Sequence, residues 1–147
     1  MEITRHFTAT TYIVFNDKVL LHLHKKLGCL LPVGGHIDRD ELPEQAAIRE
    51  VKEECGLDVL LHRTKISDSI EGVEQLHMPM HLLLEDINPH HQHIDFIYYA
   101  KTETDKLIPE HGEMERFMWL TQEEVNSKDM LPNVRMCALE ALRLLKD

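Results

Sequence analysis

The sequence is poor in basic residues and has no long apolar run, and each shortage argues against a class of partner. Its 147 residues include 16 Lys and Arg against 26 Asp and Glu, which gives a formal net charge of -10. A phosphate backbone needs a basic surface, so this balance argues against polymeric DNA or RNA as a partner. No apolar run approaches the length that crosses a bilayer, so we expect no membrane partner.

Cysteine is scarce, and its pattern does not suggest a disulfide framework. Cys29, Cys55 and Cys137 are odd in number and form no C-x-x-C motif. This favours three reduced thiols in a cytoplasmic protein. The segment MEITRHFTATTYIVF lacks the charged start, the apolar stretch and the small-residue cleavage site of a signal peptide, which agrees with a cytoplasmic location.

What the sequence does contain is typical of one folded domain. Hydrophobic residues make up 43% and charged residues 29%, a balance that argues against disorder. The length is near the most common domain size and allows a substantial core. No internal repeat, linker or low-complexity tract interrupts the chain. We therefore predict a single domain over residues 1–147.

The most informative segment is residues 35–57, GHIDRDELPEQAAIREVKEECGL. It fits the pattern G-x5-E-x7-R-E-U-x-E-E-x-G-U, in which U is a bulky aliphatic residue, at every fixed position. The fixed positions are Gly35, Glu41, Arg49, Glu50, Val51, Glu53, Glu54, Gly56 and Leu57. So many matched positions in one short segment are a far more specific signal than a short glycine pattern.

The segment from Glu44 to Cys55 predicts a helix with a carboxylate face. At about 100° per residue, Glu50, Glu53 and Glu54 share one arc of the helix. The adjacent apolar arc consists of Ala47, Ile48, Val51 and Cys55. Like charges on consecutive turns repel one another, but clustered oxygen ligands are what Mg²⁺ requires. We therefore predict a divalent-cation site that serves phosphoryl or pyrophosphoryl chemistry.

A glutamate-rich helix face is more often an ordinary solvated surface, so the flanking residues matter. Pro32-Val33-Gly34-Gly35 precedes the helix and suits a close approach of the backbone. Gly56 follows the helix and is a natural C-terminal stop. These flanks favour the functional interpretation.

The whole pattern resembles the signature of the Nudix hydrolase family. The resemblance implies an α+β fold, a three-layer α/β/α sandwich with a mixed β-sheet. It also implies Mg²⁺- or Mn²⁺-dependent hydrolysis of a pyrophosphate bond in a nucleoside-diphosphate-linked (NDP-X) or related small phosphorylated substrate. The alternative is a catalytically weak Nudix-fold protein with a nucleotide-binding or regulatory role. The intact REVKEE favours the enzyme, because a pure binder has no need of charges that repel one another.

The resemblance also implies roles for individual residues. The cation ligands would be the Gly34 carbonyl and the carboxylates of Glu50, Glu53 and Glu54. Glu41 and Arg49 would form a second layer that orients those carboxylates. The candidate general bases are Glu53, Glu54, Glu113 and Glu115. Independently of the resemblance, the position of His36 directly after Gly35 and the shared strand face of His93 and Asp95 make Gly35, His36, His93 and Asp95 the candidate substrate contacts.

Eleven histidines are the second unusual feature. His22 and His24 share a strand face, and His90, His91 and His93 crowd one short segment. A zinc or nickel site is one interpretation, because imidazole suits these metals. Surface or partly buried polar residues are the commoner outcome, and no H-E-x-x-H or Cys/His spacing supports a metal. A third interpretation places His93 and Asp95 in the substrate pocket.

Substrate and assembly stay open at this level. The extra motif of coenzyme A pyrophosphatases is not visible. The proline of many ADP-ribose enzymes and the tyrosine of many dinucleoside polyphosphate enzymes are not evident in ISDSIEGVEQ. These absences weaken three substrate classes without selecting another. A homodimer is one candidate for the oligomeric state.

Turn signals and periodicity predict the remaining elements. Thr8 to Phe15 and Lys18 to His24 are separated by Asn16-Asp17, which predicts a hairpin. Further strands are predicted at Leu30 to Pro32, Asp58 to Ile66, within Met78 to Leu84, at His93 to Lys101 and at Phe117 to Leu120. Thr121 to Glu124 has the pattern of a capping box that opens a helix. The stripe Val134, Cys137, Ala138, Ala141 and Leu145 predicts the buried face of a last helix that starts near Asn133.

Overall fold

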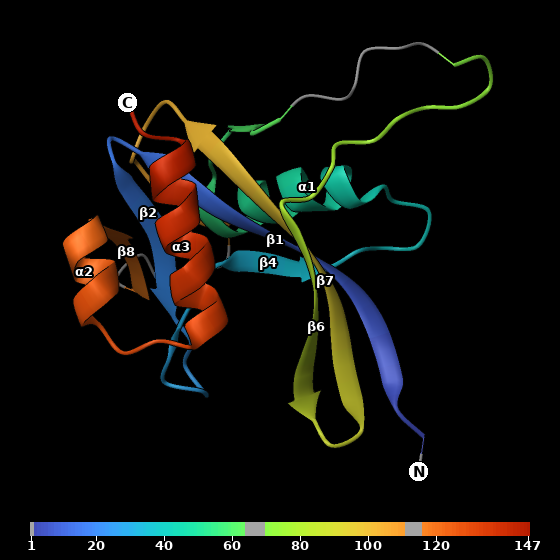
Figure 1. The fold of residues 1–147 in the computed structure, drawn as a ribbon, viewed down its shortest axis with the longest axis horizontal. Helices are drawn as coiled ribbons and strands as arrows, with labels where there is room; N and C mark the ends of the chain where they lie inside the picture. Colours follow the sequence, from blue (N-terminus) through green and yellow to red (C-terminus); the bar gives the residue numbers. More distant parts are fainter. Residues whose placement is uncertain (1, 64–69, 111–115) are drawn as a thin grey trace.

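The computed structural model describes residues 2–63, 70–110 and 116–147, which form a mixed eight-stranded sheet covered by helices (Figure 1). The strands are β1 (Thr4–Phe15), β2 (Lys18–Leu23), β3 (Leu30–Leu31), β4 (Val33–His36), β5 (Val59–Leu61), β6 (His81–Asn88), β7 (His91–Thr102) and β8 (Phe117–Leu120). The helices are α1 (Pro43–Cys55), α2 (Gln122–Ser127) and α3 (Pro132–Leu144). None of the described helices is long and apolar enough to cross a membrane. Helix α1 packs on one face of the sheet and α3 on the other, so the predicted α/β/α sandwich is confirmed.

Strands β1 and β7 form the central pair of the sheet. They run parallel from Thr4 beside His91 to Val14 beside Lys101. On the other side of β1, strand β4 pairs with Thr8 to Thr11 and β2 pairs near the C-terminal end. Strand β6 pairs with the first half of β7 and β5 with its end. The paired ends of β1, β6 and β7 therefore extend past the helices (Figure 1).

The first hairpin forms where the sequence predicted it. Asn16 and Asp17 have φ values of 50° and 60°, so both adopt the left-handed region. Two such residues make the mirror-image turn whose twist matches the two flanking strands. Asn and Asp tolerate this region better than other non-glycine residues, which explains their place between β1 and β2.

Side chains that alternate between the two faces of the central strands divide the core into two halves. Tyr12 and Val14 of β1 pack toward α3, whereas Ala9 and Ile13 pack toward α1. The predicted stripe of the last helix is confirmed, because all five of its residues are buried against the sheet. The predicted capping box also forms, since Thr121 and Glu124 bond each other at the start of α2.

The predicted apolar arc of α1 is wrong at one position. Ile48 is 44% exposed, and Ala46 is fully buried in its place. Compared with the prediction, the helix is rotated about its axis. The residues that face the sheet are Ala46, Ala47, Val51 and Cys55, and Ala46 and Cys55 are the limits of this buried arc. Glu50 and Glu54 fall inside this buried arc by helical geometry. This rotation therefore turns two of the carboxylates inward.

The predicted strand from Asp58 to Ile66 is shorter than expected. Strand β5 ends at Leu61, and His62 adds one further bond from its N–H to the carbonyl of Tyr99 at 2.7 Å. Arg63 has a φ of 67°, which breaks the extended conformation. Residues 64–66 lie outside the described part of the chain.

Candidate active site

Two glycines of β4 allow close neighbours, Gly35 a carboxylate of α1 and Gly34 the adjacent strand β1. A Cβ atom on Gly35 would lie 2.5 Å from Oε1 of Glu50. A Cβ atom on Gly34 would lie 2.6 Å from the carbonyl oxygen of Ala9 and 2.7 Å from Oγ1 of Thr10. All three distances are shorter than any stable contact, so a side chain at either position would displace its neighbours. Glycine is required here for close approach of the backbone.

The three predicted carboxylate ligands lie beside this glycine pair at different depths. The side chain of Glu50 is only 16% exposed, whereas that of Glu53 is 47% exposed. Glu54 is half-buried, and its Oε2 accepts a hydrogen bond from the backbone N–H of Gly34 at 3.1 Å. Glu50 and Glu54 therefore face the glycine strand, and Glu53 lies at the rim.

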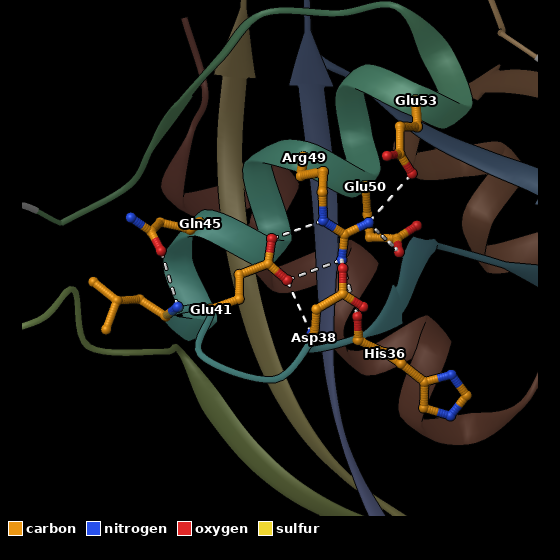
Figure 2. A network of polar contacts seen from close by, with 8 residues as sticks. His36, Asp38, Glu41, Gln45, Arg49, Glu50 and Glu53 are labelled. Carbon is orange, nitrogen blue, oxygen red and sulfur yellow. Dashed lines mark hydrogen bonds and ion pairs between the residues drawn. The ribbon is translucent and has the colours of Figure 1, made fainter.

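Arg49 connects the carboxylates to one another (Figure 2). Its Nε and Nη2 donate to the two oxygens of Glu41 at 2.7 and 3.0 Å, a bidentate pair. Its Nη1 donates to Glu50 at 2.9 Å and to Glu53 at 3.2 Å. Its Nη2 also donates to the backbone carbonyl of His36 at 3.0 Å. In the predicted second layer, Arg49 thus contacts Glu50 and Glu53 directly, and Glu41 is bonded to Arg49.

These contacts set the protonation of the site. The hydrogen bonds from Arg49 lower the pKa of Glu41, and the bonds to Glu41 in turn raise the pKa of Arg49. Glu54 behaves differently, because burial and the neighbouring Glu50 raise its pKa to about 8. The N–H of Gly34 opposes this rise without cancelling it. Glu54 therefore takes up a proton readily near neutral pH.

The donor chemistry of this cluster suits a hard divalent cation. The guanidinium of Arg49 bonds three carboxyl groups, those of Glu41, Glu50 and Glu53, and Glu54 adds a fourth beside Glu50, so carboxyl groups outnumber the one guanidinium. Carboxylate and backbone carbonyl oxygens are the ligands that Mg²⁺ and Mn²⁺ prefer, and this site offers both kinds beside the glycine strand. Among the described residues, the three glutamates do not converge within 4.8 Å as one histidine group does, and Arg49 binds two of them instead.

The predicted substrate contacts His36, His93 and Asp95 lie on the other face of the sheet. The ring of His36 points away from Arg49, although its backbone carbonyl accepts from that residue (Figure 2). The rings of His36 and His93 are 5.2 Å apart between centroids. Burial, followed by the neighbouring His36 and His91, lowers the pKa of His93. The structure brings these histidines together on the face that α1 does not cover.

Asp95 has partners that sequence reasoning missed. It is 4% exposed and accepts hydrogen bonds from Oγ1 of Thr8 at 3.0 Å and from Oγ1 of Thr10 at 2.7 Å. Burial, with Asp95 as the next cause, raises the pKa of Glu85 to about 8. The sequence shows that Thr8 and Thr10 lie on the same face of a strand. Only the register of β1 against β7, in which Thr8 lies beside Asp95, shows which carboxylate they contact.

The two later candidate bases, Glu113 and Glu115, lie outside the described residues. The described residues just before them are bonded to the C-terminal end of α1. The N–H of Ile108 donates to the carbonyl of Cys55 at 2.7 Å, and the N–H of Glu110 donates to the carbonyl of Glu53 at 3.0 Å. The chain therefore passes the helix end that carries Glu53 and Glu54.

Comparisons with known proteins agree with this geometry. A family model described as the NUDIX domain matches residues 4–142. The crystal structure of a hydrolase of the NUDIX family from Clostridium perfringens is 46% identical, and the match covers 98% of this chain and 100% of that chain at a TM-score of 0.88. A search of curated proteins found no match.

More distant structures share the fold. A UDP-X diphosphatase is 15% identical, and the match covers 99% of this chain and 64% of that chain at a TM-score of 0.63. An ADP-ribose pyrophosphatase from Streptococcus suis 89-1591 is 19% identical, with 98% and 94% covered and a TM-score of 0.61. Identities this low establish a common fold and leave the substrate of this chain open.

The raised pKa of Glu54 makes stability depend on pH when divalent cations are removed by a chelator. The pKa in the folded state, about 8, lies above the ordinary value of 4.5. The folded state therefore binds the extra proton, and this contribution to stability is lost as the pH rises toward and through 8. We expect the Tm of the wild type to fall between pH 5 and 8 relative to that of Glu54→Gln. Thermal unfolding at several pH values checks this, and parallel curves for the two proteins would contradict it. Glu85 titrates in the same range in both proteins, so the difference isolates Glu54.

Proposed function

The chain belongs to the NUDIX family, and on that premise we propose that it hydrolyses a pyrophosphate bond in an NDP-X or related small phosphorylated substrate with Mg²⁺ or Mn²⁺. The observation that carries the proposal is the glutamate cluster bonded to Arg49 beside Gly34 and Gly35. Members of this family are hydrolases that generally use divalent cations and act on small nucleotide-linked substrates.

Glu50, Glu53, Glu54 and the carbonyl of Gly34 are the groups that would hold the cation. When bound, a divalent cation neutralises charge on phosphate oxygens and lowers the pKa of a ligated water. Arg49 and Glu41 hold the carboxylates of α1 in a fixed arrangement, which a metal site requires of the groups around its ligands. Arg49 also bonds the carbonyl of His36 and so keeps β4 next to the helix.

The proposed reaction needs a water, a base and a leaving phosphate. The water oxygen forms a bond to one phosphorus, and the bond from that phosphorus to the bridging oxygen breaks. The proton of the water passes to a carboxylate, and the two products each retain a phosphate group. Glu53, Glu54, Glu113 and Glu115 are the candidate bases.

A second candidate function is a Nudix-fold protein that binds nucleotides with little catalysis. The contact of Arg49 with Glu50 and Glu53 is the observation that favours it, because these oxygens are already engaged. An assay of phosphate or nucleoside monophosphate release distinguishes the two. The panel should contain UDP-sugars, ADP-ribose and nucleoside triphosphates, each with and without Mg²⁺. Cation-dependent turnover supports the enzyme, whereas tight binding without turnover supports the alternative.

The carboxylates provide the first kinetic prediction. Glu53→Gln and Glu54→Gln preserve side-chain size and remove one charge each from the proposed cation site. We expect kcat to fall by at least ~100-fold in each variant, about 2.7 kcal/mol of transition-state stabilisation. Steady-state kinetics on the best substrate of the panel checks this. Lys52→Gln is the matched control, because Lys52 bonds Asp58 at 3.0 Å on the exposed side of the same helix. Near-normal kcat in both glutamate variants would refute the site.

Arg49 provides the second kinetic prediction. Removing its guanidinium in Arg49→Ala leaves Glu41, Glu50 and Glu53 without the cation that holds them. We expect the Mg²⁺ concentration for half-maximal activity to rise, or the rate to fall, by roughly 10–100-fold. A titration of activity with Mg²⁺ measures this, and circular dichroism reports whether the variant folds. If Arg49→Ala is unfolded at saturating Mg²⁺, the residue is a structural requirement and its orienting role is wrong.

A further inference from the structure

Four imidazole side chains, each in contact with two of the others, cluster on the sheet face that α1 leaves uncovered. They belong to His6, His36, His91 and His93. The centroids of His6 and His36 are 5.1 Å apart, and those of His36 and His93 are 5.2 Å apart. The circuit closes through His93 and His91 at 4.9 Å and through His91 and His6 at 4.5 Å. In every pair the rings meet edge to face, and in one pair Nδ1 of His6 and Nε2 of His91 are within hydrogen-bond distance.

Strand register explains why residues so distant in sequence meet here. His6 of β1 lies beside His93 of β7 in the parallel ladder, and His91 lies two residues earlier on the same face. Thr8, two residues after His6, lies beside His36 of β4. Three neighbouring strands thus direct histidines toward one region. His6, His36 and His91 come from three different strands, and only His91 and His93 share one, so the group is not contained in one local sequence motif.

The distances suit one small transition-metal ion. One nitrogen each from His6, His36 and His91 lie within 4.8 Å of one another, and Nδ1 of His6 is 2.9 Å from Nε2 of His91. A tetrahedral zinc ion with Zn–N bonds of about 2.0–2.1 Å holds its ligand nitrogens roughly 3.3 Å apart. Small side-chain rotations would therefore bring all three into range, and the ring of His93 lies next to those of His36 and His91.

We propose that His6, His36 and His91, with His93 beside them, form a zinc site that is separate from the carboxylate cluster of α1. Imidazole nitrogen is a preferred ligand of Zn²⁺ and a poor one for Mg²⁺, so the two sites select different ions. His6 and His36 are exposed, and both border a surface hollow of about 490 Å³, so an ion can enter from solvent. The zinc ion would join β1, β4 and β7 beyond the part of the sheet that α3 covers.

The site has a consequence for the carboxylate cluster. The side chain of His36 belongs to the zinc site, while its backbone carbonyl accepts a hydrogen bond from Arg49. Gly34 and Gly35, which lie beside Glu54 and Glu50, precede His36 in the same short strand. Zinc would fix the end of β4 against β1 and β7, so its binding should raise the Tm of the whole chain.

The test is metal binding by protein freed of metal with a chelator. Isothermal titration with Zn²⁺ should show one ion per chain, and Co²⁺ in its place should give the visible absorption bands of a tetrahedral site. His6→Gln/His91→Gln should weaken Zn²⁺ binding by at least tenfold and remove the Zn²⁺-dependent rise in Tm. His90→Gln is the matched control, because His90 is exposed and precedes His91 without joining the group of rings. If the double variant proves unfolded by circular dichroism, His6→Gln alone serves the same comparison.

A second variant separates this proposal from the proposed function. Glu53→Gln/Glu54→Gln should bind Zn²⁺ as the wild type does, whatever its activity. Equal Zn²⁺ affinity in wild type and His6→Gln/His91→Gln would overturn the site, as would loss of Zn²⁺ binding in the glutamate variant. Binding of inorganic phosphate that depends on the histidines, without Zn²⁺ binding, would also overturn it and assign this face to anions.

Discussion

The candidate active site depends on the bidentate ion pair between Arg49 and Glu41. Both side chains are largely shielded from solvent, at 27% and 15% exposed, so water screens their attraction only in part. The same guanidinium reaches Glu50, Glu53 and the carbonyl of His36. One side chain therefore holds together a helix face of like charges, the loop before the helix and the glycine strand. Without it, the carboxylates of α1 would repel one another and lose their fixed positions.

The second constraint is steric, and it places glutamates of α1 in a buried position that stability alone would not favour. Because Gly35 lacks a side chain, α1 packs close to β4 with the carboxylate of Glu50 against that glycine, and Glu54 lies in the same buried arc of the helix. Burial beside Glu50 then raises the pKa of Glu54 to about 8, a cost that a purely structural helix would avoid. Strong perturbation of a carboxyl group in such a place is typical of functional sites.

Local features of the fold could be predicted from sequence, whereas features set by packing between strands could not. The Asn16-Asp17 turn and the limits of α1 follow from residue preferences, and both formed as expected. The orientation of α1 about its axis, which exposes Ile48, depends on the space beside Gly35 of β4. Likewise the histidines were conspicuous in sequence, but the group they form depends on the register of β1 against β4 and β7. Alternation along a strand fixes which face each residue takes, but it does not say which residues of β1, β4 and β7 lie side by side.

The central claim is that the glutamates of α1 bind a divalent cation that serves hydrolysis. The most direct measurement is electron paramagnetic resonance of free Mn²⁺ during titration into the protein, with a non-hydrolysable nucleotide present to supply phosphate oxygens. The account predicts that the wild type and His6→Gln/His91→Gln bind Mn²⁺ equally, and that Glu53→Gln/Glu54→Gln binds it at least tenfold more weakly. Undiminished Mn²⁺ binding by Glu53→Gln/Glu54→Gln would contradict the account.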